Sequence, residues 1–344
     1  MKQIELSFSN SSTTFLFNAS FAAVTTFTAI DNTVIITDEN VFNKHKRTFK
    51  GWQTIVLPAG EQFKNQATID NIINQLISLG ANRKTFLVGV GGGVVTDITG
   101  YVAGIYMRGL SFGFVPTSIL AMVDASIGGK NGIDVGLYKN MVGLIRQPAF
   151  LLYDYSLLSS LPRAEWINGF AEIIKHAAIK DAAMFRMLEQ HKLIDFKKDT
   201  KLLDKLIQRN ALLKAKVVQE DEFEQGDRKL LNFGHTFGHA IENSYQLPHG
   251  HAVTIGMIVA AVFSEVYKKF ADTPRLTKLI QQYGLPVYQA FNAKKVLAVM
   301  QSDKKKVKDE MHYVLLAKIG KAVVQTIPVS DIEKMVLQLA KNKA

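Results

Sequence analysis

Five short apolar runs, with helical patterns between some of them, constrain the fold of this chain most strongly. The runs are TVIIT, QTIVL, TFLVGV, SFGFV and FLLYD, at residues 33–37, 53–57, 85–90, 111–115 and 150–154. After the second run, ATIDNIINQLISLG has apolar residues at helical spacing, and Gly80 follows as a stop signal. Strands alternating with helices predict a largely parallel sheet covered by helices.

The second half of the chain has mainly helical periodicity. Helices are predicted within 164–179, 199–222, 252–270 and 273–284, and HYVLLAKIG and KAVVQTIPV near the end predict a pair of strands. We therefore expect an α/β, Rossmann-like nucleotide-binding domain over 1–155. A mostly α-helical domain would follow over 156–344.

Composition excludes several classes of site and partner. None of the 344 residues is Cys, so disulfides and thiolate ligands are excluded, and any metal must be held by His, Asp or Glu. The net charge is +11, but no basic stripe alternates with aromatic residues, so we expect no nucleic-acid partner. The apolar stretch FAAVTTFTAI is too short to span a bilayer. We expect a cytoplasmic protein with no membrane partner.

A glycine-rich turn in LVGVGGGVVTDITGYVAG predicts a nucleotide site. Gly89, Gly91, Gly92 and Gly93 lie where a strand leads into a helix, and the match to the dinucleotide fingerprint is loose. The stretch PAGEQFKNQAT at 58–68 adds Glu61 and Lys64 after another strand, where a ribose-binding carboxylate is expected. A purely structural turn is the alternative.

A second polar segment follows the glycine turn. Asp97 lies early in the next helix, and Arg108 is predicted to end that helix. The stretch from 115 to 140 then places Asp124, Lys130, Lys139 and Asn140 among glycines. A polar, glycine-rich segment after a strand predicts a loop that binds an anion.

The histidine-rich segment GHTFGHAIENSYQLPHGHA, at 234–252, predicts a metal site. It holds four of the eight histidines of the chain. His235 and His239 are one helical turn apart and share a face, so either both are ligands or one is a ligand and the other a proton carrier. His249 can supply a further nitrogen, and Glu172, on an apolar helix, is the candidate carboxylate. Zinc or another divalent ion suits such a set.

Several longer motifs are shared with one known family. They are GEQFK, GGGVVTD, MRG, VDASIGGKNG, KNMVG, GFAEIIK, KAKVVQEDEFEQGDRKLLNFGHTFGHAIE, HGHAV and DKK, spread from about residue 38 to 316. Through them the chain resembles the 3-dehydroquinate synthases, which are sugar-phosphate cyclases of the shikimate pathway. The chain has His251 where the family usually has Glu.

The resemblance implies a role for each matching residue. Glu172, His235 and His249 would bind zinc or cobalt, with His239 nearby as a non-ligand. The residues implied to bind NAD are Asp38, Glu61, Gln62, Phe63, Lys64, Gly92, Gly93, Val94, Asp97, Thr117, Ser118, Lys130, Lys139, Ser160 and Leu161. The residues implied to bind the substrate or to take part in catalysis are Arg108, Asp124, Lys130, Asn140, Lys175, Lys216, Arg228, Asn232, His239 and Lys305.

The family's reaction is the activity that the resemblance implies. 3-Deoxy-arabino-heptulosonate 7-phosphate, a small phosphorylated keto acid, would become 3-dehydroquinate and phosphate. NAD transiently oxidises a ring hydroxyl, phosphate leaves by β-elimination, the hydride returns, and an aldol step closes the new ring. The chain would be a phosphate-eliminating lyase and a homodimer.

Three alternatives have different signatures. Another sugar-phosphate cyclase, such as a deoxy-scyllo-inosose or valiolone synthase, would share the fold, NAD and metal; Lys216, Arg228, Asn232 and His239 together favour the dehydroquinate enzyme. A polyol dehydrogenase of the glycerol dehydrogenase type would lack this dense set of cations and would release NADH. A basic nucleic-acid-binding scaffold would leave the metal and NAD motifs unexplained.

Overall fold

The chain forms two compact units. The computed structural model describes residues 1–136, 138–301, 306, 307 and 309–341. The first unit comprises Met1–Trp166 and Lys214–Phe223, and the second comprises Ile167–Leu213 and Glu224–Ala344.

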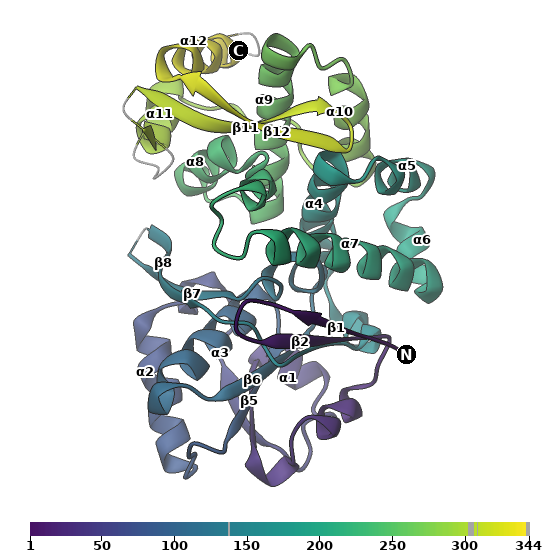
Figure 1. Ribbon diagram of the computed structural model, residues 1–344, viewed down its shortest axis with the longest axis vertical. Helices are drawn as coiled ribbons and strands as arrows, with labels where there is room; N and C mark the ends of the chain where they lie inside the picture. The colour runs from purple at the N-terminus through teal and green to yellow at the C-terminus, as the bar shows by residue number, and fades with distance from the viewer. Residues whose placement is uncertain (137, 302–305, 308, 342–344) are drawn as a thin grey trace. The chain divides into compact units, whose positions relative to one another are not determined.

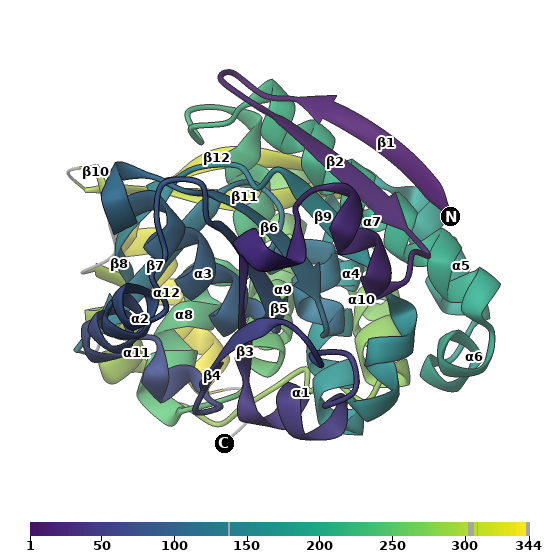
Figure 2. The same ribbon diagram turned by 90° about the horizontal axis from the view of Figure 1, so that it is seen from below.

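A seven-stranded sheet forms the centre of the first unit (Figures 1 and 2). The strand order is β1-β2-β9-β6-β5-β3-β4, and every neighbouring pair is parallel except β1 with β2. All five predicted strands are confirmed, and their β-branched and aromatic residues suit a parallel sheet, of which only the edge strand β4 is largely unburied. The strands are β1 (Lys2–Ser7), β2 (Ser12–Phe17), β3 (Thr33–Asp38), β4 (Gln53–Leu57), β5 (Phe86–Gly91), β6 (Ser111–Pro116) and β9 (Phe150–Tyr153).

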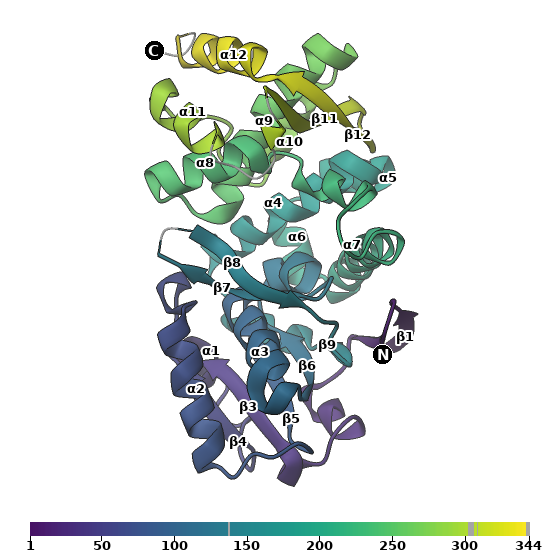
Figure 3. The ribbon, with the colours of Figure 1, turned by 60° about the vertical axis from the view of Figure 1, so that its left-hand side comes forward.

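Three helices connect these strands and pack on the sheet. They are α1 (Glu39–Lys44), α2 (Gln66–Ser78) and α3 (Gly93–Ile105). Figure 3 shows α2 and α3 side by side, and α3 contacts both β5 and β6. Ile69, Ile72 and Leu76 on α2 are fully buried, as their spacing predicts. Gly80 has φ +72° just past the end of α2, a backbone conformation that favours glycine.

The glycines of this turn differ in how closely their surroundings pack against them. A Cβ on Gly89 would lie 2.8 Å from Thr99 Oγ1, and one on Gly91 would lie 2.5 Å from the Val95 side chain. Those two glycines let α3 approach β5 closely. Gly92 caps α3 at its N-terminus with φ −76° and no side-chain capping bond. A Cβ there would meet nothing nearer than Ser118 Oγ, at 3.6 Å. Packing therefore does not require a glycine at Gly92.

The segment predicted as an anion-binding loop is largely a β-hairpin, which corrects the prediction. After a short π-helical turn, β7 (Lys130–Val135) pairs with β8 (Tyr138–Ile145) in antiparallel register, beside α3 (Figures 2 and 3). Gly132 faces Gly143, and a Cβ on Gly132 would lie 2.6 Å from the Val142 carbonyl oxygen. The glycines that hid the strand pattern are thus required by close strand pairing.

Two further features differ from the sequence prediction, namely an N-terminal hairpin and the end of α3. The N-terminal hairpin of β1 and β2 was not identified from the sequence, although Phe15, Leu16 and Phe17 of β2 are buried in the core. Helix α3 ends at Ile105 rather than at Arg108. Met107 and Arg108 follow in left-handed backbone conformations, with φ +48° and +70°. Regular helical hydrogen bonding cannot continue through such residues.

The second unit is mostly helical, as predicted, with a small antiparallel sheet. Helices α8 and α9 pack closely, and strand β11 lies against α9 (Figure 1). The helices are α4 (Arg163–Lys180), α5 (Ala182–Gln190), α6 (Leu193–Lys198), α7 (Thr200–Glu220), α8 (His235–Tyr245), α9 (His249–Lys268), α10 (Thr273–Gln282), α11 (Ala293–Gln301) and α12 (Val329–Lys341). The sheet order is β10 (Lys306–Val307), β11 (Glu310–Lys318) and β12 (Lys321–Pro328). Helices α4 and α7 are each divided between the two units, so each begins in one unit and ends in the other.

The apolar residues of helix α9 are mostly buried in the core of this unit. It alone among the described residues is long and apolar enough to cross a bilayer, but 67% of its most apolar window is buried within the protein. A buried core helix satisfies the same length and composition test.

Candidate functional site

A carboxylate and two imidazoles converge in the second unit. Glu172 from α4, His235 from the start of α8 and His249 from the start of α9 each offer one ligand atom, and these atoms lie within 4.8 Å of one another. Glu172 Oε1 is 3.2 Å from His249 Nε2 and 3.7 Å from His235 Nε2. One carboxylate and two imidazoles are a common ligand set for a divalent transition metal.

The backbone before α8 sets the direction of His235. Gly234 caps the helix with φ +81°, and a Cβ there would lie 2.8 Å from the Val253 carbonyl oxygen, so only glycine fits. Nδ1 of His235 lies 3.2 Å from the Phe233 carbonyl oxygen, to which it can donate. Burial, assisted by the Lys175 ammonium, lowers the pKa of His235 well below its usual range. If Nδ1 donates to that carbonyl, a neutral His235 presents the lone pair of Nε2 toward Glu172.

His249 lies between two carboxylates. Its Nε2 faces Glu172, and its Nδ1 lies 3.4 Å from Oε2 of Glu242 on α8. Although burial alone would lower it, hydrogen bonds to Glu172 and Glu242 raise the pKa of His249 to about 10. Glu242 is 5% exposed and was not assigned a role from the sequence. Its place two helical turns after His235 is the signal that could have identified it.

Two neighbours on α4 surround Glu172. Lys175 Nζ forms an ion pair with Glu172 Oε2, and both side chains are buried. His176 Nε2 is 4.0 Å from the same oxygen, and its Nδ1 lies 2.7 Å from Oδ1 of Asn210 on α7. A buried carboxylate requires such compensation. Lys175, predicted as a catalytic residue, is thus within contact of the proposed ligand Glu172.

The remaining histidines of this segment lie at the edge of the cluster. The His239 ring is exposed, and its centroid is 5.0 Å from that of His235 and 6.5 Å from that of His249. His251 is half-buried in the first turn of α9, and burial lowers its pKa. Neither belongs to the group of ligand atoms found among the described residues.

Two further predicted residues of the second unit lie in the turn before α8. Arg228 is buried, and Asn232 donates from Nδ2 to Glu224 Oε1 at 2.6 Å. Lys305, also predicted as a substrate contact, lies outside the described residues.

In the first unit, the residues predicted to bind NAD gather at the carboxyl ends of parallel strands. Asp38 ends β3, the Gly60–Lys64 turn follows β4, Gly92 follows β5, and Thr117 and Ser118 follow β6. Strand order reverses between β3 and β5, which creates the crevice where such sheets bind ligands. Asp38 Oδ1 also accepts from the Asn40 and Val41 amides, so it caps α1. Ser160, after β9, hydrogen-bonds His45 Nε2 at 2.8 Å.

Lys64 joins two other predicted residues. Its Nζ donates to Asp97 Oδ2 at 2.5 Å and to Asn140 Oδ1 at 2.6 Å. Burial raises the pKa of Asp97 to about 6 against the opposing effect of Lys64. Although burial works the other way, Asp97, Glu61 and Asp134 raise the pKa of Lys64, which stays cationic. A buried ammonium thus contacts α3, the helix that follows the glycine turn.

The other predicted residues of the first unit are dispersed. Lys130 and Lys139 lie exposed on the β7–β8 hairpin, and Arg108 is also exposed. Lys216 is exposed on α7, 3.9 Å from Glu220. Asp124 forms an ion pair with Lys214, whose Nζ lies 2.6 Å away. Lys214 is buried and was not predicted as a site residue from the sequence. Its position two residues before Lys216 in the KAKVV motif offered a signal.

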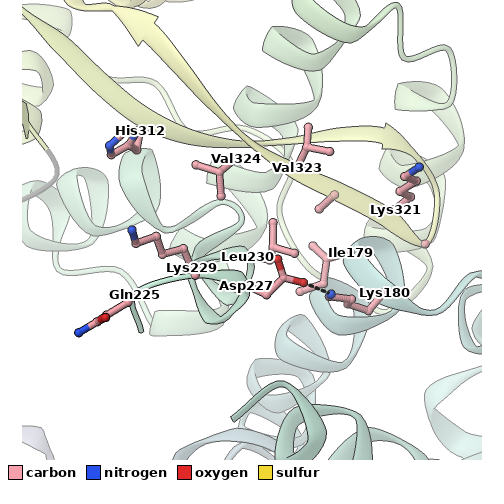
Figure 4. Close-up of a pocket in the computed structure, with 13 residues that line it drawn as sticks. Ile179, Lys180, Gln225, Asp227, Lys229, Leu230, His312, Lys321, Val323 and Val324 are labelled. Atoms are coloured by element: carbon pink, nitrogen blue, oxygen red, sulfur yellow. Dashed lines mark hydrogen bonds and ion pairs between the residues drawn. The ribbon is translucent and has the colours of Figure 1, made fainter. Parts of the chain in front are cut away.

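A separate hollow of about 550 Å³ lies in the second unit, between the end of α4, the turn before α8 and β12 (Figure 4). Lys180, Lys229 and Lys321 line it, and Lys180 Nζ pairs with Asp227 at 2.7 Å. None of the predicted site residues is among its lining residues. The hollow is therefore distinct from the cluster of Glu172, His235 and His249.

Known proteins with similar sequences and structures identify the family of this chain. Models of the N- and C-terminal parts of 3-dehydroquinate synthase match residues 54–168 and 169–306. The 3-dehydroquinate synthase of Pyrococcus abyssi is 40% identical over 287 residues, 83% of each chain. That of Nitrosospira multiformis is 43% identical over 276 residues, 78% of this chain and 75% of the relative. The 2-epi-5-epi-valiolone synthase of Streptomyces hygroscopicus, solved with NAD⁺ and Zn²⁺, is 25% identical, with a TM-score of 0.86 and full coverage of both chains.

Proposed function

The chain belongs to the 3-dehydroquinate synthase family, and on that premise we propose that it converts 3-deoxy-arabino-heptulosonate 7-phosphate to 3-dehydroquinate and inorganic phosphate. The observation that carries the proposal is the convergence of Glu172, His235 and His249 within 4.8 Å. These residues come from three helices, and they match the family's metal-ligand motifs one by one. No separate observation favours another cyclase or a polyol dehydrogenase.

The first unit would bind NAD at the strand ends around Gly92. Uncapped N–H groups at the start of α3 suit a diphosphate, and Asp38, across the switch point, suits a ribose hydroxyl. When bound, NAD supplies a hydride acceptor that returns the hydride later, so the reaction has no net redox change. The buried Lys64 ammonium adds positive potential beside α3, and Asp97 and Asn140 hold it in place.

The second unit would bind a zinc or cobalt ion at Glu172, His235 and His249. The donor set fits, because one carboxylate and two imidazoles converge and both Nε2 atoms face the same carboxylate oxygen. A bound ion would serve as a Lewis acid toward a substrate hydroxyl and lower the pKa of its proton. The exposed His239 imidazole lies beside this group and would accept or release a proton at a ring nitrogen.

We assign the remaining cations and amides to the phosphorylated keto acid. Lys175 and Arg228 are buried cations of the second unit, and Arg108, Lys130 and Lys216 are exposed cations of the first. Such groups bind and orient a substrate that carries both a carboxylate and a phosphate. We also propose a cytoplasmic homodimer, which size-exclusion chromatography with light scattering would test.

A phosphate-release assay tests the proposed activity. The purified protein with NAD, Zn²⁺ or Co²⁺ and 3-deoxy-arabino-heptulosonate 7-phosphate is expected to release one phosphate per substrate. Absorbance at the NADH band should stay flat, because the hydride returns within each turnover. Steady accumulation of NADH would instead identify a dehydrogenase, and no phosphate release with metal and NAD present would overturn the proposal.

Gly92→Ala is expected to weaken NAD binding while the fold is kept. The added Cβ has room, with Ser118 Oγ at 3.6 Å as its nearest neighbour, but it would occupy space beside the proposed diphosphate site. We expect the NAD dissociation constant to rise about tenfold, or about 1.4 kcal/mol, in calorimetric titration. The melting temperature without NAD serves as the control and should change little. Unaltered NAD affinity would place the diphosphate elsewhere.

A further inference from the structure

One buried acid of the second unit has no part in the function proposed above. Glu242 lies on α8, seven residues after His235, and is 5% exposed. Residues at positions i, i+4 and i+7 share one face of a helix, so Glu242 continues the stripe of His235 and His239. Burying a carboxylate is costly unless a donor faces it. Nδ1 of His249, at 3.4 Å from Glu242 Oε2, is such a donor.

The two carboxylates on either side of His249 constrain its tautomer. An imidazole that binds a metal is neutral and carries one proton, so it donates from only one of its two nitrogens. Nε2 faces Glu172 at 3.2 Å, within the candidate ligand group, and Nδ1 faces Glu242. A metal held at Nε2 needs the lone pair there, which requires the proton to be on Nδ1. An ionised carboxylate accepts hydrogen bonds and cannot donate them, so Glu242 would hold the Nδ1 proton once the lone pair of Nε2 is given to the metal.

His235 reaches the same tautomer by another route. Its Nδ1 lies 3.2 Å from the Phe233 carbonyl oxygen, which also only accepts hydrogen bonds. Its Nε2 is then left to face Glu172. Both imidazoles therefore have an acceptor behind Nδ1 and the candidate metal position in front of Nε2. The backbone supplies the acceptor for one ring, and a side chain supplies it for the other.

We propose that Glu242 is a positioning residue that fixes the tautomer and orientation of His249 for metal binding. The inference rests on the proposed function, because it requires Glu172, His235 and His249 to be the ligands. Outer partners of this kind contribute roughly 10- to 100-fold to metal affinity. Because Glu242 acts through His249, its removal should weaken metal binding directly, and loss of activity should follow from loss of metal.

Two substitutions at Glu242 separate positioning from packing. Glu242→Gln keeps the shape of the side chain, but its amide can donate as well as accept, so it no longer selects one tautomer. Glu242→Ala removes the partner altogether. We expect the Co²⁺ dissociation constant, measured at one fixed pH by competition with a chelator, to rise about tenfold in Glu242→Gln and up to about 100-fold in Glu242→Ala.

Two readouts besides activity accompany the titration. The visible absorption bands of bound Co²⁺ report the ligand geometry and should shift in both variants. Nitrogen-15 NMR of the zinc-loaded wild-type protein should show the proton of His249 on Nδ1. The melting temperature of the metal-free Glu242→Gln protein should match that of wild type, which separates the effect from folding.

The possible results distinguish failure of the positioning role of Glu242 from failure of the proposed function. If wild type binds Co²⁺ and Glu242→Gln binds it equally tightly with unshifted bands, the positioning role is wrong and the proposed function stands. If wild type itself binds no divalent metal, the proposed function fails, and the inference fails with it. Should Glu242→Ala not fold, the Glu242→Gln comparison alone decides.

Discussion

Replacing His249 by Ala is expected to remove the tightly held divalent metal from the purified protein and to reduce phosphate release roughly 1,000-fold. The substitution deletes one of three ligand atoms that lie within 4.8 Å of one another. It also leaves the buried Glu242 carboxylate without its His249 contact. A reduction of that size corresponds to about 4 kcal/mol of transition-state stabilisation, a reasonable contribution for a Lewis acid.

His251→Ala is the matched control for this prediction. His251 lies two residues later on the same helix, is half-buried, and is not part of the ligand group. Its substitution should leave metal content and phosphate release close to those of wild type. Metal per chain is measured by plasma emission spectroscopy after dialysis, with phosphate release in parallel. Equal loss of metal in the two variants would show that the ligand assignment is wrong.

Gly256→Ala is expected to destabilise the second unit by about 3 kcal/mol or more. A Cβ at Gly256 would lie 1.9 Å from the Gly234 carbonyl oxygen and 2.8 Å from the Gly238 amide nitrogen. Both neighbours are backbone atoms, so no side chain can rotate away, and α8 and α9 would have to separate. Because Gly234 directly precedes His235, the displacement should also weaken metal binding.

The measurement for Gly256→Ala is thermal unfolding followed by circular dichroism, with and without Zn²⁺. Val266→Ala is the control, because Val266 lies on the same helix and is 67% exposed. That change should alter the free energy of unfolding by no more than about 0.5 kcal/mol. We also expect the stabilisation by Zn²⁺ to be smaller in Gly256→Ala than in the control. A wild-type melting temperature for Gly256→Ala would contradict close packing of these helices.

Much of the fold follows from patterns that are local in the sequence. The runs at 33–37, 53–57, 85–90, 111–115 and 150–154 became strands because each is rich in β-branched or aromatic residues, and all but the edge strand at 53–57 are mostly buried. Helix α2 formed where apolar residues recur at helical spacing before Gly80. The hairpin of β7 and β8 escaped prediction because its glycines face one another across the strands, a relation that the sequence does not display.

The candidate site also has features that the sequence predicted and features that depend on tertiary packing. The residue types and their spacing in GHTFGHAIE and HGHAV indicated a metal and, through the family resemblance, proposed its ligands. The assignments of individual residues, and of NAD binding to 1–155 and metal and substrate binding to 156–344, remain proposals. The role of Glu242 could not be read in advance, because its contact with His249 depends on how α8 packs against α9.

By itself, the sequence determined the α/β and helical halves, the absence of thiolate ligands, and the family to which the chain belongs. These properties depend on residue type, periodicity and short motifs. Only the tertiary structure decided that Glu172 meets His249, 77 residues away, and that each of the two imidazoles turns Nε2 toward it. Hydrogen-bond partners and burial depend on distances between helices, and packing sets those distances, not position along the chain.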